Sequence, residues 1–243
     1  MSGMGSTSLS GPKWFDDVQL CRMKTAEQVM ILNLPRGPRW TKMGYRMLVL
    51  LLLSYTELLS ATSILEVSFS ELCRDSQVIV EGRVSRVTTK RDENSGLIWT
   101  VVTIDTSDLI SGNLSKPVLQ LEFLGGTHNG VTLNVGEMQV PEAGETGIYF
   151  INKPGAKQVH PLTGWGQGHF ILQTDAKGIQ RIATARKRPV AQVEPSDASE
   201  HSVLSKGTAK GVKVVAGAKP PLSQAMNADD FKALIRTTSS EFR

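Results

Sequence analysis

The chain of 243 residues is long enough for one or two domains, and only its middle part, from about residue 77 to 181, shows dense hydrophobic alternation. Its 6% aromatic content and 22 glycines are more typical of a β protein with many turns than of a helical bundle. Seven of the 27 basic and four of the 23 acidic residues precede Thr62, so the basic balance belongs largely to that leader and is weak support for nucleic-acid binding.

The apolar run from Met47 to Leu53 carries no charge, follows Lys42 and Arg46, and precedes the small residues Ser60 and Ala61. This order is typical of a secretory signal peptide. The run is too short for a bilayer-spanning helix, which needs about 20 residues. We therefore predict cleavage after Ala61 and export to the periplasm or the extracellular space.

A signal peptide normally begins near the start of its chain, whereas 42 residues precede this one. We therefore predict a non-native or disordered extension over 1–42, a signal peptide over 43–61, and a start at Met43 or Met47 in place of Met1. Two alternatives stay open for the apolar run: a buried core helix, and an uncleaved anchor that would be the protein's contact with the membrane.

Cysteine usage agrees with a processed chain. Cys21 lies before the cleavage point, so Cys73 would be alone after processing and could form no internal disulfide. We expect Cys73 to be buried and unreactive. No cysteine follows the apolar run where a lipid anchor would need one.

The first predicted elements are a short helix over Phe69–Arg74 and a strand in which Val78, Val80 and Val84 share one face. The polar stretch KRDENSG then turns the chain, and LIWTVVTIDT forms the second arm of a hairpin. We expect these two strands to pair.

Three further strands follow in chain order. In VLQLEFLGG, Leu119, Leu121 and Phe123 point to one side, and the pair Asn129-Gly130 predicts a tight hairpin turn. The stretch TGIYFINK is apolar on both faces, which predicts a central or barrel-closing strand.

The stretch LTGWGQGHF at 162–170 is predicted to begin a sixth strand. With a period of two, one face would carry small and then large residues, namely Gly164, Gly166, Gly168, Phe170 and Leu172. Such a taper suits the narrow inside of a small barrel. A phosphate-binding loop would instead need the spacing G-x-G-x-x-G before a helix.

The order of the predicted elements resembles that of exported, mostly uncharacterised bacterial proteins with a small OB-type barrel. The resemblance rests on the stretches SELCRDSQVIVEGRV, LEFLGG, an Asn-Gly hairpin, GEMQVPEAGETGIYFI and GWGQGHF, in that order. It is also similar in outline to the netrin-like domain of the tissue inhibitors of metalloproteases. Those inhibitors open on a cysteine that clamps the protease zinc. This chain has no cysteine at its predicted mature start, so that chemistry cannot be carried over.

The predicted fold is therefore mainly β: a small closed or partly open antiparallel barrel, OB-like, with five to six strands, over 66–181. A short N-terminal helix precedes it. We expect a flexible linker over 182–222, because its Pro, Gly, Ser and Lys residues cannot bury enough surface to fold alone. An amphipathic helix over 223–238 then docks on the barrel or on a partner.

No motif of a hydrolase, a P-loop or a calcium loop occurs in the mature part, so we predict no enzyme, no catalytic residue and no cofactor. Carboxylates such as Glu122, Glu137 and Glu142 could form an acid–base pair, but surfaces carry such residues routinely. A metal-dependent hydrolase or metal-binding protein is the first alternative. It would need three histidines to converge, namely His128, His160 and His169.

The predicted ligand-binding residues are Trp165, Gln167 and His169, which a strand would place on one outer face, where an aromatic plane beside polar groups can stack a ligand. The basic run RKR at 186–188 leaves a single-stranded nucleic-acid-binding barrel as the second alternative, which export disfavours. The sequence favours an exported, non-enzymatic binding or accessory module of the cell envelope. Its expected partner is an envelope protein or a small ligand.

Overall fold

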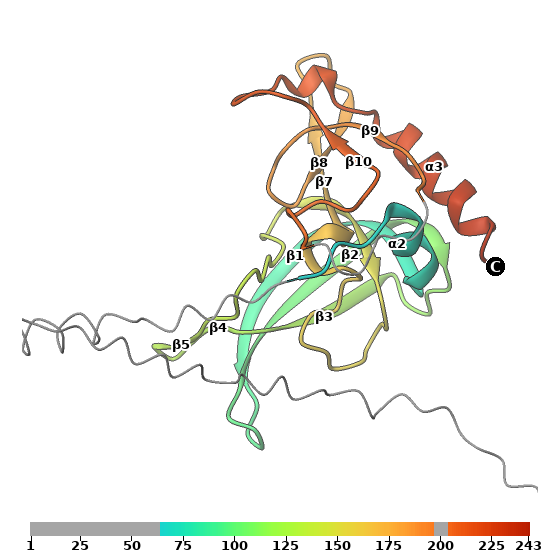
Figure 1. Ribbon diagram of the computed structural model, residues 1–243. Coiled ribbons are helices and arrows are strands. Elements are labelled where there is room, and N and C mark those ends of the chain that lie inside the picture. The colour runs from blue at the N-terminus through green and yellow to red at the C-terminus, as the bar shows by residue number, and fades with distance from the viewer. Residues whose placement is uncertain (1–63, 197–203) are drawn as a thin grey trace, which may run out of the picture. The chain divides into compact units, whose positions relative to one another are not determined.

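The computed structural model of the protein describes residues 64–196 and 204–243 (Figure 1). The predicted extension and signal peptide lie outside these residues. Within the two ranges, no helix has the length and hydropathy that crossing a bilayer requires.

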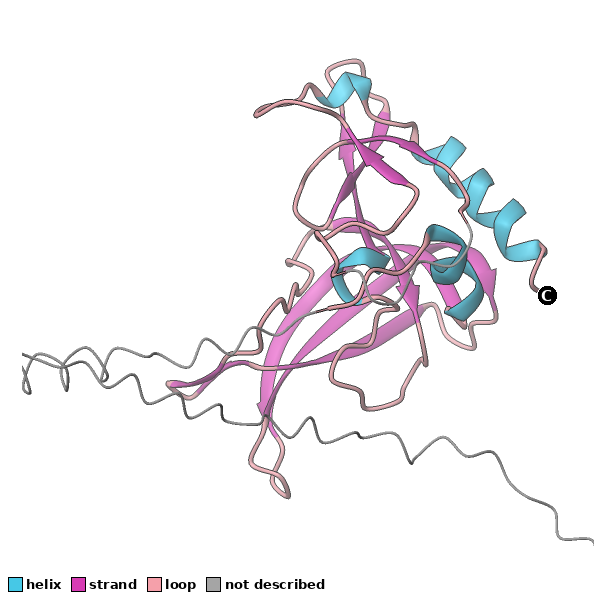
Figure 2. Cartoon of the chain, in the orientation of Figure 1, coloured by secondary structure: helices cyan, strands magenta, loops and turns pink. Residues whose placement is uncertain are grey.

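The helices are α2 (Phe69–Asp75) and α3 (Ala228–Ser240), and two short 3₁₀ helices are η1 (Trp165–Gly168) and η2 (Leu222–Gln224). The strands are β1 (Val78–Arg91), β2 (Ile98–Gly112), β3 (Val118–Leu124), β4 (Gly126–His128), β5 (Val131–Leu133), β6 (Thr146–Ile151), β7 (His169–Thr174), β8 (Gln180–Thr184), β9 (Val190–Val193) and β10 (Val212–Val214). The prediction of a mainly β fold is confirmed (Figure 2).

Both helices begin where their sequences supply a cap. Ser68 and Glu71 form a capping box at the start of α2, in which each side chain bonds the other residue's backbone N–H. The Asn227 side chain accepts a hydrogen bond from the Asp229 N–H at the start of α3. The predicted helices at both ends of the domain are confirmed.

Six strands form one antiparallel sheet in the order β3-β2-β1-β6-β7-β8. The long β1–β2 hairpin and the Asn129-Gly130 turn between β4 and β5 are as predicted, with φ values of 49° and 78° at those two turn residues. In β6, every residue after Thr146 is buried, because β6 is central between β1 and β7. The prediction of a central strand from TGIYFINK is confirmed.

The main sheet does not close into a barrel, since β3 and β8 form its two edges. Closure, which the glycine taper of 164–168 favoured, is therefore not found. Those glycines do not belong to a strand at all, as described below.

A hydrophobic core lies on each face of the sheet. The first joins the sheet to α2, α3 and β9, with Phe69, Phe150, Phe170 and Phe231 at its centre. The second lies on the opposite face, over β1, β2, β3 and β6. Its buried residues are Val78, Val80, Val84, Val102, Ile104, Leu119, Leu121, Phe123, Tyr149, Ile151 and Leu162. The faces predicted for the first and third strands are thus confirmed.

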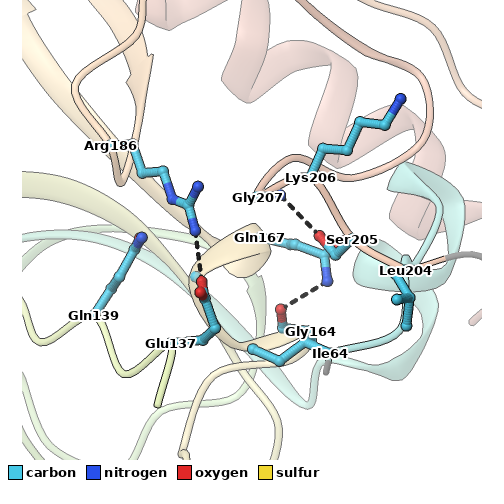
Figure 3. Close-up of a pocket in the computed structure, with 11 residues that line it drawn as sticks. Ile64, Glu137, Gln139, Gly164, Gln167, Arg186, Leu204, Ser205, Lys206 and Gly207 are labelled. Carbon is cyan, nitrogen blue, oxygen red and sulfur yellow. Dashed lines mark hydrogen bonds and ion pairs between the residues drawn. The ribbon is translucent and has the colours of Figure 1, made fainter. Parts of the chain in front are cut away.

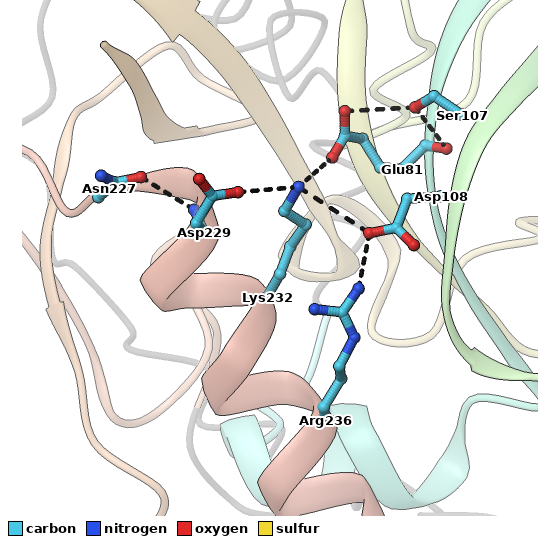
Figure 4. Close-up of polar contacts among 7 residues, drawn as sticks. All are labelled: Glu81, Ser107, Asp108, Asn227, Asp229, Lys232 and Arg236. Carbon is cyan, nitrogen blue, oxygen red and sulfur yellow. Dashed lines mark hydrogen bonds and ion pairs between the residues drawn. The ribbon is translucent and has the colours of Figure 1, made fainter.

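Helix α3 docks on the first core through Phe231, which is fully buried. Polar contacts also join α3 to β1 and β2: Lys232 Nζ lies 2.9 Å from Glu81 Oε2, and Arg236 Nη2 lies 2.7 Å from Asp108 Oδ2 (Figure 4). Burial opposes the charge of Lys232, but its bonds to Glu81 and Asp229 outweigh that effect and raise the pKa of the lysine.

The segment predicted as a flexible linker, 182–222, contains ordered strands. It includes the end of β8 and the whole of β9 and β10, which pair with each other. Val190, Val193 and Ala209 reach the first core. Scattered small apolar residues in this segment therefore cover the sheet, although their composition resembles that of a linker.

Candidate functional site

The strand predicted at 162–170 is wrong over its first half. The chain turns sharply at Gly164 and Trp165, with φ values of 63° and 60°, and Trp165–Gly168 then forms η1. A Cβ atom on Gly168 would lie 2.2 Å from the Thr163 carbonyl oxygen. These glycines therefore permit a tight turn, and the strand β7 begins only at His169.

The turn buries Gln167, which is 3% exposed. Its Oε1 accepts from the Val67 N–H at 3.1 Å, and its Nε2 donates to the carbonyl oxygens of Leu65 at 2.9 Å and Gly164 at 3.1 Å. One amide side chain thus fixes both η1 and the extended segment 64–68.

The segment 64–68 is also bonded on a second side. The Ser205 N–H donates to the Ile64 carbonyl, and the Lys210 N–H donates to that of Val67, both at 2.8 Å. The segment 64–68 is therefore held between η1 and 204–210.

A cleft of about 240 Å³ lies where these segments meet. Figure 3 shows its lining residues, which come from 64, the loop before β6, η1, the β8–β9 turn and 204–207: Ile64, Glu137, Gln139, Gly164, Gly166, Gln167, Arg186, Leu204, Ser205, Lys206 and Gly207. The volume is slightly below the range of about 300–1,000 Å³ usual for drug-sized ligands. It fits a small molecule or one side chain of a partner.

Opposite charges face each other at the cleft. Arg186 Nη2 lies 2.5 Å from Glu137 Oε2, and the two side chains are 46% and 48% exposed. The Lys206 side chain points away from this pair (Figure 3). An exposed ion pair of this kind contributes only about 0–1 kcal/mol, so a ligand that offers both charges can replace it at little cost.

The backbone around the cleft is strained. Four non-glycine residues in the described ranges have positive φ, and two of them, Glu137 at 58° and Trp165 at 60°, line the cleft or lie between lining residues. A third, Lys187, follows Arg186. Such strain is concentrated at ligand sites more often than elsewhere.

The three predicted ligand-binding residues do not share an outer face. Gln167 and His169 are buried, and only Trp165 is partly exposed. Trp165 stacks on His160 with ring centroids 5.0 Å apart, and His160 meets Phe123 edge-on at 5.1 Å. Trp165 therefore packs on His160 and, unlike its neighbours Gly164 and Gly166, is not among the residues that line the cleft.

His160 and His169 both lie inside the protein. His160 Nδ1 accepts from the Leu162 N–H at 3.2 Å, which places the proton of the neutral ring on Nε2. Burial lowers the pKa of His160 to about 3, and the nearby His169 adds to the shift. Nε2 of His160 and Nδ1 of His169 have no hydrogen-bond partner in the described part of the chain.

His169 is held by a carboxylate and an aromatic ring. Its Nε2 lies 2.7 Å from Glu145 Oε1, and its ring stacks on Tyr149 at 5.2 Å. Burial and the Glu145 carboxylate raise the pKa of Tyr149. The third histidine, His128, lies on β4 near Thr89. Across residues 64–196 and 204–243, no three His, Cys, Asp or Glu side chains gather closely enough to hold a metal ion.

The carboxylates weighed as an acid–base pair are engaged separately. Glu122 pairs with Lys90, Glu137 with Arg186, and Glu142 with Lys187. The last two cations belong to the basic run RKR, which forms the ordered β8–β9 turn. Cys73 is buried between α2 and α3, and burial raises the pKa of its thiol to about 12.

Sequence reasoning missed Arg186, Gln139 and 204–207 as lining residues, because their convergence depends on the folding of a segment with linker-like composition. The positive φ of Glu137 also has no sequence signal. The comparisons with known proteins add nothing to this site, since no family model, no curated protein and no solved structure matches the chain.

Proposed function

We propose that this protein is an exported, non-enzymatic binding module of the cell envelope, and that it holds a small zwitterionic ligand in the cleft beside η1. The observation that carries the proposal is the cleft itself, which has a cation and an anion among its lining residues and strained backbone at Glu137 and Trp165. Export is supported by the signal-peptide pattern that ends at Ala61.

The charges define the ligand class. A carboxylate binds Arg186 and an ammonium group binds Glu137, so that both replace the ion pair between these side chains. The apolar part of the ligand then lies against Ile64 and Leu204, of which Leu204 is 55% exposed. A free amino acid with an apolar side chain, or the end of a short peptide, has this combination.

The non-enzymatic part of the proposal is supported by how the reactive groups are used. Cys73 and His160 are buried, and burial raises the pKa of the thiol and lowers the pKa of the imidazole, so that both side chains stay neutral near pH 7. Glu145 is bonded to His169. We also propose that the curved, unclosed sheet with its helix before the first strand is an open relative of the OB-type barrel, on the strength of the element order.

The experiment is a thermal-shift screen of the mature chain against the free amino acids, with their N-acetyl amides as controls that lack both charges. Amino acids with apolar side chains should raise Tm in a saturable way, and the amides should not. Gly166→Val should remove the shift, because a Cβ on Gly166 already lies 2.7 Å from Gln139 Oε1 in the cleft. Lys177→Val, on the exposed β7–β8 turn, is the matched control.

A saturable shift that survives in Gly166→Val would place the ligand elsewhere. If no amino acid shifts Tm at millimolar concentration, the zwitterion proposal fails.

A further inference from the structure

The two edge strands of the main sheet differ in how the chain covers them. On the outer side of β8, the Ile182 N–H donates to the Met226 carbonyl at 3.1 Å, and the Thr184 N–H donates to that of Arg188 at 2.9 Å. An isolated bridge joins β8 to Asn227 as well. The chain itself thus pairs this edge.

The ladder between β2 and β3 shows which backbone groups of β3 point outward. The Thr106 N–H donates to the Pro117 carbonyl at 2.8 Å, so the odd-numbered residues of β3 face β2 and the even-numbered ones face away. The Leu124 N–H follows this rule, since it donates outward to the Val159 carbonyl at 3.1 Å.

The three even-numbered residues before Leu124 are Val118, Gln120 and Glu122. In the described ranges, their backbone N–H and C=O groups form no hydrogen bond. Val118 is 47% exposed and Gln120 is exposed, so solvent reaches this edge. Three consecutive outward pairs of donor and acceptor make a template for one more strand.

We propose that the β3 edge binds an extended segment of a partner protein by antiparallel strand addition. This surface is separate from the cleft, and the proposal stands or falls independently of the ligand proposed there. A segment of five residues places its first, third and fifth residues opposite Glu122, Gln120 and Val118 and forms up to six backbone hydrogen bonds with them.

The side chains of β3 specify the chemistry of this segment. The first residue is basic, because it lies directly across from Glu122, whose side chain is 29% exposed beside Lys90. The fifth is apolar, because it lies across from the exposed Val118. The second and fourth lie across from Leu121 and Leu119, on the side of the second core, and are apolar.

A second copy of this chain fits the edge less well. Two β3 strands paired about Gln120 would place Val118 of each copy opposite Glu122 of the other, an apolar side chain against a carboxylate. They would also bring the loop before Val118 to the outer side of Leu124, where Val159 already accepts the N–H. A free segment that ends opposite Glu122 avoids both conflicts.

The test is fluorescence anisotropy with the mature chain and a labelled peptide, lysine–valine–threonine–valine–valine with one threonine added at each end. The peptide should bind saturably. N-methylation of the central threonine removes the N–H that bonds the Gln120 carbonyl and should weaken binding at least tenfold. N-methylation of the first valine, whose N–H points away from β3, is the matched control and should leave affinity within about threefold.

A variant of the protein tests the same contact from the other side. Gln120→Pro removes an N–H that β2 does not use, so the sheet should remain intact while peptide binding is lost. Gln120→Ala keeps the N–H and should bind as the wild type does. The circular dichroism spectrum of each variant checks the fold, and the N-methylated peptides test the wild-type chain should Gln120→Pro not fold.

Three results would overturn the proposal. They are no binding at millimolar peptide, equal binding of the two N-methylated peptides, and a stable dimer in sedimentation that Gln120→Pro converts to monomer, which would assign the edge to a second copy.

Discussion

The side chain of Gln167 offers the sharpest test of how the cleft is built. Substituting leucine keeps the approximate volume but removes the amide, which makes three hydrogen bonds of 2.9–3.1 Å to the backbone of residues 64–68 and η1. Each bond contributes about 1 kcal/mol net. The half-buried Val67 amide would also lose its partner, although Leu65 is 47% exposed and its carbonyl can bind water. We expect Gln167→Leu to lower the free energy of unfolding by about 2–4 kcal/mol.

The assay is urea denaturation followed by circular dichroism, combined with hydrogen exchange at the Val67 amide. Exchange at Val67 should accelerate in Gln167→Leu much more than exchange at central β6, because the segment 64–68 loses one of its two attachments. Gln192→Leu, at an exposed position of β9, controls for the general effect of the substitution. A loss below about 0.5 kcal/mol with unchanged Val67 exchange would refute the reasoning.

Three further predictions concern stability. Burial lowers the pKa of His160 to about 3, so the unfolded chain binds more protons than the folded chain below about pH 6.5. The free energy of unfolding should therefore fall as the solution becomes more acidic, by up to about 1.4 kcal/mol per pH unit. Calorimetry should find a smaller pH slope in His160→Gln. Phe231→Ala should cost about 3–5 kcal/mol in urea denaturation, because Phe231 is fully buried against Phe69 and Phe170. Lys232→Met should lower the free energy of unfolding by about 1–3 kcal/mol at pH 7, because Glu81 loses its cation. The stability difference from the wild type should shrink as the pH rises through the raised pKa of the lysine. The first prediction is contradicted by an unchanged pH slope in His160→Gln, and the second by a stability loss below 1 kcal/mol in Phe231→Ala. The third is contradicted if the stability difference between Lys232→Met and the wild type stays constant up to strongly alkaline pH.

The elements with strong local patterns were predictable from sequence. The short helix from Phe69, the long first hairpin, the Asn129-Gly130 turn and β6, which is apolar on both faces, each carry a periodicity or a turn residue with a direct structural cause. Their order and type follow from residues that are neighbours in the chain.

The candidate site was not predictable in the same way. The alternating glycines at 164–168 are compatible with the two-residue period of a strand and equally with a tight turn. The structure has the turn, in which Gly164 adopts positive φ. The segment 182–222 has the composition of a linker, yet Val190 and Val193 are buried against the sheet. Contacts over long sequence distances, such as Arg186 with Glu137, arise only after that segment has folded.

The measurement that tests the central claim most directly is native mass spectrometry of the protein isolated from the envelope fraction of its source. We predict a chain that begins at Thr62 and carries a small bound molecule, which dissociates on collisional activation and is absent from Gly166→Val. A chain that retains residues 1–61 and is recovered from the cytoplasm, or a mature chain with no bound mass after addition of apolar amino acids, would contradict the account.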